Sequence, residues 1–278
     1  MKNAYFILGL LLLLLGNGSS QATPAAAGDA VMIVKATRIT RYGDQIGYLL
    51  LIPQDEALSS AKPYPGLLLN HGFGRDYSRH IDNAIHFAAA GMVVMVPKLL
   101  ETGQFSVIDQ TEVNNVADHV RWLIAQSTAP SSPLYEILDS QRIAMAGHSA
   151  GGALSLEATV VLQHEDISPS GLLLWDAVPY MRTYQAAEGL EPLPLLSLRA
   201  SPNGCNAYGA IGRLTSNIPF PLETILLPRS SHCDFEAPTD VVCELTCGKS
   251  TESNQLAVRD LSLDFLRQIF DLPDIQGI

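Results

Sequence analysis

One short motif constrains this chain more than any other feature: residues 147–152 have the sequence Gly-His-Ser-Ala-Gly-Gly. An apolar run, residues 143–146, precedes the motif, and a helix-like segment, residues 153–158, follows it. Between a strand and a helix, Gly-x-Ser-x-Gly forms a sharp turn that strains the serine backbone and holds its hydroxyl above the sheet. The flanking glycines let strand and helix approach closely. The motif therefore predicts a nucleophilic Ser149 beside the positive end of a helix.

The N-terminal residues differ in character from the rest of the chain. The 278 residues, 47% of them apolar, suffice for one sizeable α/β domain. A positively charged start and the apolar run 5–15 are followed by small and polar residues, which is typical of a secretory signal peptide. We expect this peptide at residues 1–27, with cleavage between about residues 18 and 27. An apolar run of about eleven residues is short for a membrane span, which favours cleavage over a retained anchor.

Cleavage would leave a single domain at residues 28–278, secreted or periplasmic and without a stable membrane span. The formal net charge of −11 argues against nucleic acid and anionic membranes as partners. Four cysteines lie in the last third of the chain and should form two disulfides in an oxidising compartment: Cys205, Cys233, Cys243 and Cys247. Four cysteines allow three pairings, and the sequence does not choose among them. Zinc is the alternative, but Cys-x3-Cys without a nearby histidine pair is a poor zinc motif, so no metal site is predicted.

Strand and helix patterns alternate along the chain, which predicts a mostly parallel sheet with helices on both faces. Residues 31–41 and 46–52 alternate apolar and polar side chains and should form an antiparallel N-terminal hairpin. Further strands are expected at residues 66–70, 92–96, 143–146, 171–175, 194–199 and 224–227, and helices at residues 77–90, 112–126, 153–163 and 254–270. The segment 177–192 is a candidate cap over the site.

The base must follow Ser149, because nucleophile, acid and base occur in that order in folds of this kind. Only His164 and His232 meet this condition. His164 lies at the far end of the helix after the motif, whereas His232 follows the last predicted strand. Catalytic groups collect at the carboxyl ends of parallel strands, so His232 is the predicted base. The structural alternative is a surface histidine in a serine-rich turn.

The acid must lie between Ser149 and His232, directly after a strand. Asp176 alone fits, because it follows the apolar run 171–175. The strand at residues 194–199 is followed by Ser-Pro-Asn and no carboxylate, so the acid is expected one strand earlier than is usual. The alternative role for Asp176 is a helix cap or turn residue.

Two backbone N–H groups are needed to hold the oxyanion that develops on a reacting carbonyl. Ala150, directly after the nucleophile, should supply one of them. The other should come from the loop after the strand at residues 66–70, where His71 and Gly72 precede Phe73. Phe73 is therefore the second predicted donor, with its ring lining the substrate pocket, and His71 is expected to brace the loop rather than act as a base.

Three segments carry a resemblance to the α/β-hydrolase superfamily, nearest its chlorophyllase-like and dienelactone-hydrolase-like branch: residues 147–152, Asp176 followed by Ala-Val, and residues 231–235 (Ser-His-Cys-Asp-Phe). Chlorophyllases place their acid after the same strand, in an Asp-Pro-Val context, and the resemblance thus supports Asp176. The chain departs from chlorophyllases at Ala150, where they carry Arg, and in the segment 233–247. Dienelactone hydrolases carry Cys where this chain has serine. The resemblance implies an α/β-hydrolase fold.

These features predict a secreted serine hydrolase that cleaves small-molecule or lipid-like carboxylic esters through an acyl-enzyme on Ser149. No metal or organic cofactor is needed for that reaction. Two alternatives remain open: an acyltransferase that uses the same three residues with an alcohol acceptor, and a non-catalytic binding protein on a hydrolase fold. The acyl-chain preference and the oligomeric state cannot be predicted.

Overall fold

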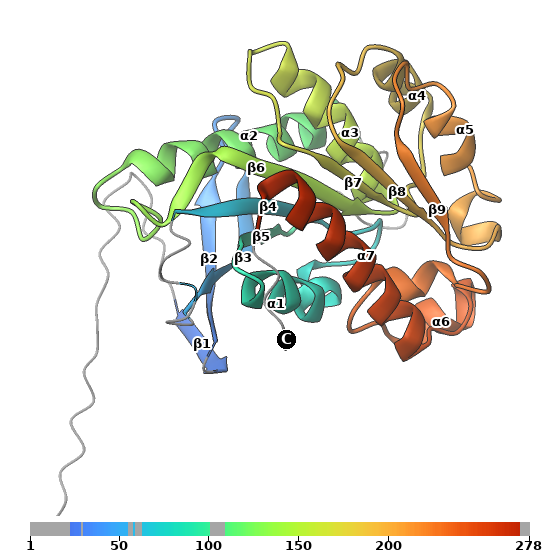
Figure 1. Ribbon diagram of the computed structural model, residues 1–278, viewed down its shortest axis with the longest axis horizontal. Coiled ribbons are helices and arrows are strands. Elements are labelled where there is room, and N and C mark those ends of the chain that lie inside the picture. Colours follow the sequence, from blue (N-terminus) through green and yellow to red (C-terminus); the bar gives the residue numbers. More distant parts are fainter. Residues whose placement is uncertain (1–22, 29, 55–57, 59–62, 101–108, 273–278) are drawn as a thin grey trace, which may run out of the picture.

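The computed structural model describes residues 23–28, 30–54, 58, 63–100 and 109–272. Within these residues, nine strands form one sheet in the order β1-β2-β3-β5-β4-β6-β7-β8-β9 (Figure 1). The strands are β1 (Thr23–Gly28), β2 (Val31–Ile39), β3 (Gln45–Pro53), β4 (Tyr64–Asn70), β5 (Val93–Pro97), β6 (Leu138–His148), β7 (Leu172–Trp175), β8 (Leu195–Arg199) and β9 (Glu223–Leu226). The α-helices are α1 (Ile81–Ala89), α2 (Gln110–Thr128), α3 (Ala150–Gln163), α4 (Met181–Glu188), α5 (Ile211–Thr215), α6 (Val241–Cys247) and α7 (Glu252–Phe270). The 3-10 helices with described bounds are η2 (Tyr77–His80), η3 (Gly204–Asn206) and η4 (His232–Phe235).

The sheet is mostly parallel. The neighbouring pairs from β5 through β4, β6, β7 and β8 to β9 all run parallel. At the N-terminal end, β2 and β3 form an antiparallel hairpin in which Val31 lies opposite Pro53, and β3 is antiparallel to β5. The predicted α/β-hydrolase fold with its N-terminal hairpin is confirmed.

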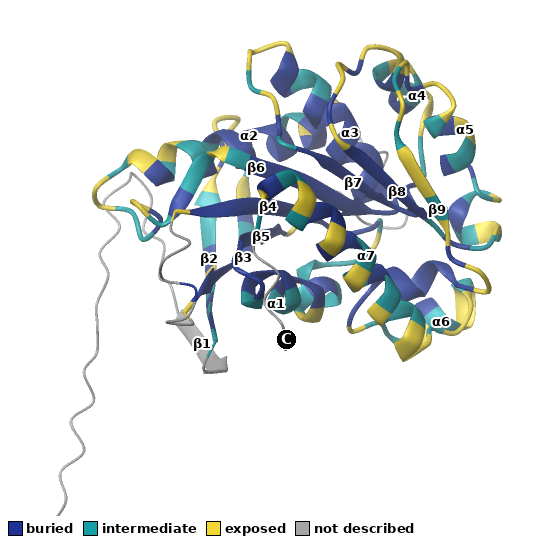
Figure 2. Cartoon of the chain, in the orientation of Figure 1, coloured by how far each residue is buried: buried dark blue, intermediate teal, exposed yellow. Residues whose placement is uncertain are grey.

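Helices cover both faces of the sheet, and the central strands are buried on both sides (Figure 2). In β4, Leu68 packs into the apolar cluster beneath α2 and α3, whereas Leu67 and Leu69 pack into the cluster beneath α1 and α7. Successive strand residues point to opposite faces, so an uninterrupted apolar run fills both clusters. This arrangement fixes the strand ends that carry the site.

Some elements differ from the sequence prediction. β6 begins at Leu138, five residues before the predicted start, because the polar residues at 139–142 continue the strand beyond its buried part. The predicted cap segment contains α4, which is short and mostly polar. α6 was not predicted, because its 7 residues are too few to show a helical periodicity in the sequence.

The N-terminal prediction falls mostly outside the described residues, which begin at Thr23. β1 overlaps the region where we predict cleavage and pairs antiparallel with β2. The signal peptide at residues 1–27 therefore stays a prediction. In the described part of the chain, no helix is both long enough and apolar enough to cross a membrane.

Candidate active site

Ser149 lies in the turn between β6 and α3, with φ 56° and ψ −123°. A positive φ is strained for a residue with a side chain and persists only where surrounding contacts hold it. The Ser149 N–H donates to the carbonyl of Trp175 at 2.9 Å, and its own carbonyl accepts from the Val178 N–H at 3.0 Å. These bonds fix the strained serine to the chain just before and just after Asp176.

The glycines of the motif are required by close backbone approaches. A Cβ at Gly147 would lie 2.6 Å from the backbone nitrogen of Gly152. A Cβ at Gly151 would lie 2.5 Å from the carbonyl oxygen of Asn70, at the end of β4. No side chain fits at either position without displacing backbone, in agreement with the expectation from the motif.

Asp176 and His232 are brought into direct contact. The Nδ1 atom of His232 lies 2.6 Å from Oδ2 of Asp176, whose side chain is completely buried. The Ala200 N–H donates to Oδ1 of Asp176 at 3.0 Å, and the Asn206 amide donates to Oδ2 at 3.0 Å. An ionised carboxylate can only accept hydrogen bonds, and the Ala200 and Asn206 groups that face it are N–H donors. The His232 nitrogen that faces it, Nδ1, must therefore carry the proton, which leaves Nε2 as an acceptor.

Asn206 was not singled out by the sequence. It lies in η3, in the loop after β8, which carries no carboxylate. Its side-chain oxygen accepts from the N–H groups of Asn203 at 2.8 Å and Gly209 at 2.9 Å, which fixes the amide so that its nitrogen faces Asp176. Its position after β8 is the only signal that could have indicated this role.

The His232 ring packs against His148, the residue before Ser149, with ring centroids 4.4 Å apart. Burial holds the pKa of His148 well below its usual value, so this second imidazole is neutral. Among the described residues, the Ser149 hydroxyl makes no hydrogen bond to the His232 ring. Such contacts are often long without substrate and tighten when it binds.

The loop after β4 runs directly against the motif. A Cβ at Gly72 would lie 3.1 Å from Cβ of Ser149 and 3.4 Å from Nδ1 of His148. Phe73 follows, partly buried against the apolar cluster that contains Ala150. Ala150 is the first residue of α3, so its N–H has no partner within the helix. The Phe73 N–H likewise donates to no group in the described part of the chain. Neither N–H group thus has a hydrogen-bond partner among the described residues.

His71 braces this loop. The Leu99 N–H donates to Nε2 of His71 at 3.0 Å, so the proton lies on Nδ1, which donates to the Gly72 carbonyl at 2.9 Å. Complete burial lowers the pKa of His71 to about 4, so the ring is neutral near pH 7. With both nitrogens engaged, His71 holds the loop and has no free atom to serve as a base.

The four cysteines form two disulfides, Cys205–Cys247 and Cys233–Cys243. Two disulfides were predicted, and the pairing ties both loops of the site to α6: Cys233 directly follows His232, and Cys205 directly precedes Asn206. The chain-entropy relation gives roughly 4 kcal/mol of stabilisation for the first bridge, which closes 42 residues, and roughly 3 kcal/mol for the second. The sulfurs are bonded to one another and are therefore not thiolate ligands.

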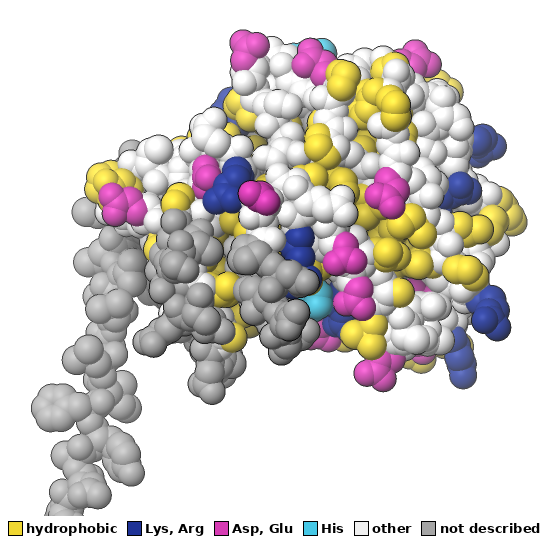
Figure 3. Space-filling model, in the orientation of Figure 1, with side chains coloured by type: hydrophobic (Ala, Val, Ile, Leu, Met, Phe, Trp, Pro, Cys, Tyr) yellow, Lys and Arg dark blue, Asp and Glu magenta, His cyan; other side chains and the backbone are white. Residues whose placement is uncertain are grey.

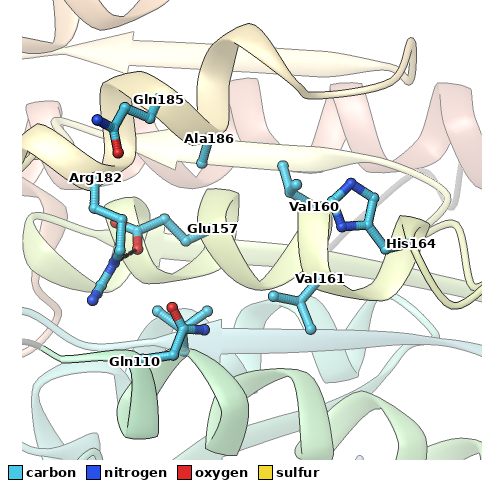
Figure 4. A pocket seen from close by; sticks show the side chains of 9 residues that line it. Gln110, Glu157, Val160, Val161, His164, Arg182, Gln185 and Ala186 are labelled. Atoms are coloured by element: carbon cyan, nitrogen blue, oxygen red, sulfur yellow. Dashed lines mark hydrogen bonds and ion pairs between the residues drawn. The ribbon is translucent and has the colours of Figure 1, made fainter.

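A cavity of about 290 Å³ lies apart from these residues, between α2, α3 and α4 (Figure 4). Val160 and Val161 are among the residues that line it, and His164 lies at one end of it. Inside, the buried Glu157 is paired with Arg182 and accepts from the Thr183 hydroxyl at 2.6 Å. Ser149, Asp176 and His232 do not line this cavity, and His164 lies far along α3 from the motif, as expected.

Residues 48–190, just over half of the chain, match the sequence profile of the family described as Chlorophyllase. The chain belongs to the chlorophyllase family. The match includes Phe73, Ser149 and Asp176 and ends before His232. A search of curated protein sequences gives no match.

Solved structures share the fold of this chlorophyllase-family chain. A dienelactone hydrolase from Anabaena variabilis is 14% identical with a TM-score of 0.62, over 89% of this chain and 98% of that one. An esterase from Rhizomucor miehei is 12% identical with a TM-score of 0.61, over 87% and 84% of the two chains. An acetyl xylan esterase from Paenibacillus sp. R4 is 14% identical with a TM-score of 0.56, over 74% and 81%. The predicted resemblance to the α/β-hydrolase superfamily is confirmed.

Proposed function

We propose that this chain is an exported serine hydrolase of carboxylic esters, with Ser149 as nucleophile, His232 as base and Asp176 as acid. The observation that carries the proposal is the 2.6 Å bond from the His232 ring to the buried Asp176 carboxylate, directly beside the strained turn at Ser149. A serine held at positive φ after a strand, next to an imidazole oriented by a carboxylate, is the arrangement that acyl transfer requires.

The proposed reaction has two halves. Nε2 of His232 takes the hydroxyl proton as Ser149 Oγ attacks the ester carbonyl, and the N–H groups of Phe73 and Ala150 bind the resulting oxyanion. His232 then gives the proton to the departing alcohol, which leaves an acyl group on Ser149. Water, deprotonated by His232, attacks the acyl carbon. The bond from that carbon to Ser149 Oγ then breaks, His232 returns the proton to Oγ, and the carboxylic acid is released. Asp176 stays ionised and stabilises the imidazolium formed in each half.

We also propose that the chain is exported, with residues 1–27 as its signal peptide. The apolar run near the N-terminus supports this proposal, as do the two disulfides, which form and persist in oxidising compartments. The substrates we propose are small or lipid-like esters, for which Phe73 offers an apolar contact beside the nucleophile. No cofactor takes part in this scheme.

Ser149→Ala tests the assignment. We expect it to lower kcat for a p-nitrophenyl ester by at least about 10³-fold while the thermal unfolding temperature stays close to that of the parent chain. A fluorophosphonate probe should label the parent chain at Ser149 and leave the variant unlabelled. Unchanged turnover in the variant would overturn the nucleophile, and a parent chain that is neither active nor labelled would favour a binding protein.

A further inference from the structure

α6 has its apolar face turned toward solvent. The exposed fractions are 65% for Val241, 61% for Val242 and 82% for Leu245. At 3.6 residues per turn these side chains fall within a sector about 100° wide, and Cys243 and Cys247 lie on the opposite side of the helix. Surface helices of globular proteins usually bury their apolar stripe. Here cysteines take the inner side, and the apolar side chains are left without a partner among the described residues.

The helix is held in place without using these apolar side chains. Both of its cysteines are in disulfides, to Cys233 and Cys205. Asp240 caps the helix by accepting from the Cys243 N–H at 2.9 Å and also pairs with Arg75 at 3.1 Å. The apolar face is therefore presented by a rigid support, so little conformational freedom is lost when it binds.

This face lies close to the proposed catalytic residues. η4 begins with His232, and its next residue, Cys233, is bridged to α6. The other bridge joins the end of α6 to Cys205, beside the asparagine that orients Asp176. Figure 1 places α6 beside the start of α7, and Figure 3 shows hydrophobic side chains at the surface in this region. A surface bound by α6 would thus be held near the nucleophile.

We propose that the exposed face of α6 (Val241, Val242 and Leu245) docks the protein onto an uncharged or zwitterionic lipid–water interface that carries its ester substrate. This inference rests on the proposed ester hydrolysis and specifies that the ester is part of a lipid–water interface rather than dissolved in water. Area and charge both favour such a surface over other occupants.

Area argues against a second protein. Three aliphatic side chains expose at most a few hundred Å², well below the roughly 800 Å² that each partner buries in a stable interface. A lipid surface sets no minimum interface area, because affinity for it rises with whatever apolar area enters the interface.

Charge argues against anionic lipid. The chain carries a formal net charge of −11, which repels an anionic surface. The acidic groups of the helix are engaged within the protein: Asp240 with Arg75, and Glu244 with the Ser250 hydroxyl at 2.6 Å. They lie away from the apolar sector and do not prevent contact with an uncharged surface.

The test compares the parent chain, the double variant V242S/L245S and the control Ile39→Ser, with disulfides intact. Ile39 is also exposed and apolar, at 55%, but lies at the end of β2 near the other edge of the sheet. Binding is measured by flotation with phosphatidylcholine and phosphatidylglycerol vesicles. Activity is measured on soluble p-nitrophenyl acetate and on a tributyrin emulsion.

We expect the parent chain and Ile39→Ser to bind phosphatidylcholine vesicles and to bind phosphatidylglycerol less well. The double variant should lose binding and emulsion activity by about tenfold or more, with its activity on the soluble ester unchanged. Equal binding by all three chains, or concentration-dependent dimerisation abolished by V242S/L245S, would overturn the proposal. Vesicle binding without activity on any ester would refute the proposed function and leave the docking surface standing.

Discussion

Replacing Asp176 by asparagine tests the geometry of the site most directly. The Asp176 carboxylate faces three N–H donors, from His232, Ala200 and Asn206, at 2.6 to 3.0 Å. The asparagine side chain has one oxygen that can accept a hydrogen bond and one NH2 group that cannot. In either orientation of the amide, the NH2 group therefore faces at least one of these N–H donors. The clash between the NH2 group and the His232 N–H disappears if the imidazole carries its proton on Nε2 instead of Nδ1. In that tautomer Nε2 is already protonated and cannot accept the proton of Ser149. We expect kcat to fall by about 10⁴-fold, equivalent to about 5.5 kcal/mol of transition-state stabilisation.

The matched control is Asp234→Asn. Asp234 is equally buried, lies two residues from His232, and accepts from the N–H groups of Ser231 at 2.7 Å and Thr251 at 2.6 Å, but it does not touch the His232 ring. We expect this control to lower the free energy of unfolding and to change kcat by less than about tenfold. Steady-state hydrolysis of a p-nitrophenyl ester and urea denaturation measure both quantities. A drop in kcat of less than tenfold for Asp176→Asn, or equal losses in the two variants, would refute the reasoning.

Two further predictions concern stability. Gly151→Ala should lower the free energy of unfolding by about 1–3 kcal/mol in urea denaturation, because its Cβ would meet the Asn70 carbonyl at 2.5 Å. Gly204→Ala, whose Cβ would meet nothing within 4 Å, should cost less, and equal costs would contradict the steric argument. Burial lowers the pKa of His71 to about 4 and that of His80 to about 3. Below about pH 6.5 the unfolded chain therefore binds protons at these histidines while the folded chain does not. The free energy of unfolding should have its full value above pH 6.5 and should decrease as the pH falls toward 4. The loss is about 3 kcal/mol for His71 alone. An unfolding temperature that stays constant from pH 7 to pH 4 would show that these rings are protonated in the folded state.

The sequence was informative where local patterns determine structure. The apolar run of β4 and the glycines around Ser149 follow directly from burial and backbone sterics, and they led to the correct fold class. Asp176 and His232 each follow a predicted strand, and the structure places them in contact. Their catalytic roles remain proposals.

Asn206 and α6 could not be predicted, because their positions depend on long-range contacts. The role of Asn206 comes from a hydrogen bond to a residue thirty positions earlier in the chain, in a different strand's loop. α6 is held by disulfides whose pairing the sequence leaves open, and its apolar residues would ordinarily predict a buried face. Neither this hydrogen bond nor these disulfides produce a periodic pattern in the sequence.

The bond between Asp176 and Asn206 has a consequence for how such sites diverge. The two side chains come from the loops after adjacent strands, and their polar atoms lie 3.0 Å apart. If the carboxylate and the amide exchanged places, the two side chains could still form this hydrogen bond, with the acidic group now carried by the loop after β8. Two substitutions would thus separate lineages that keep their acid on different strands.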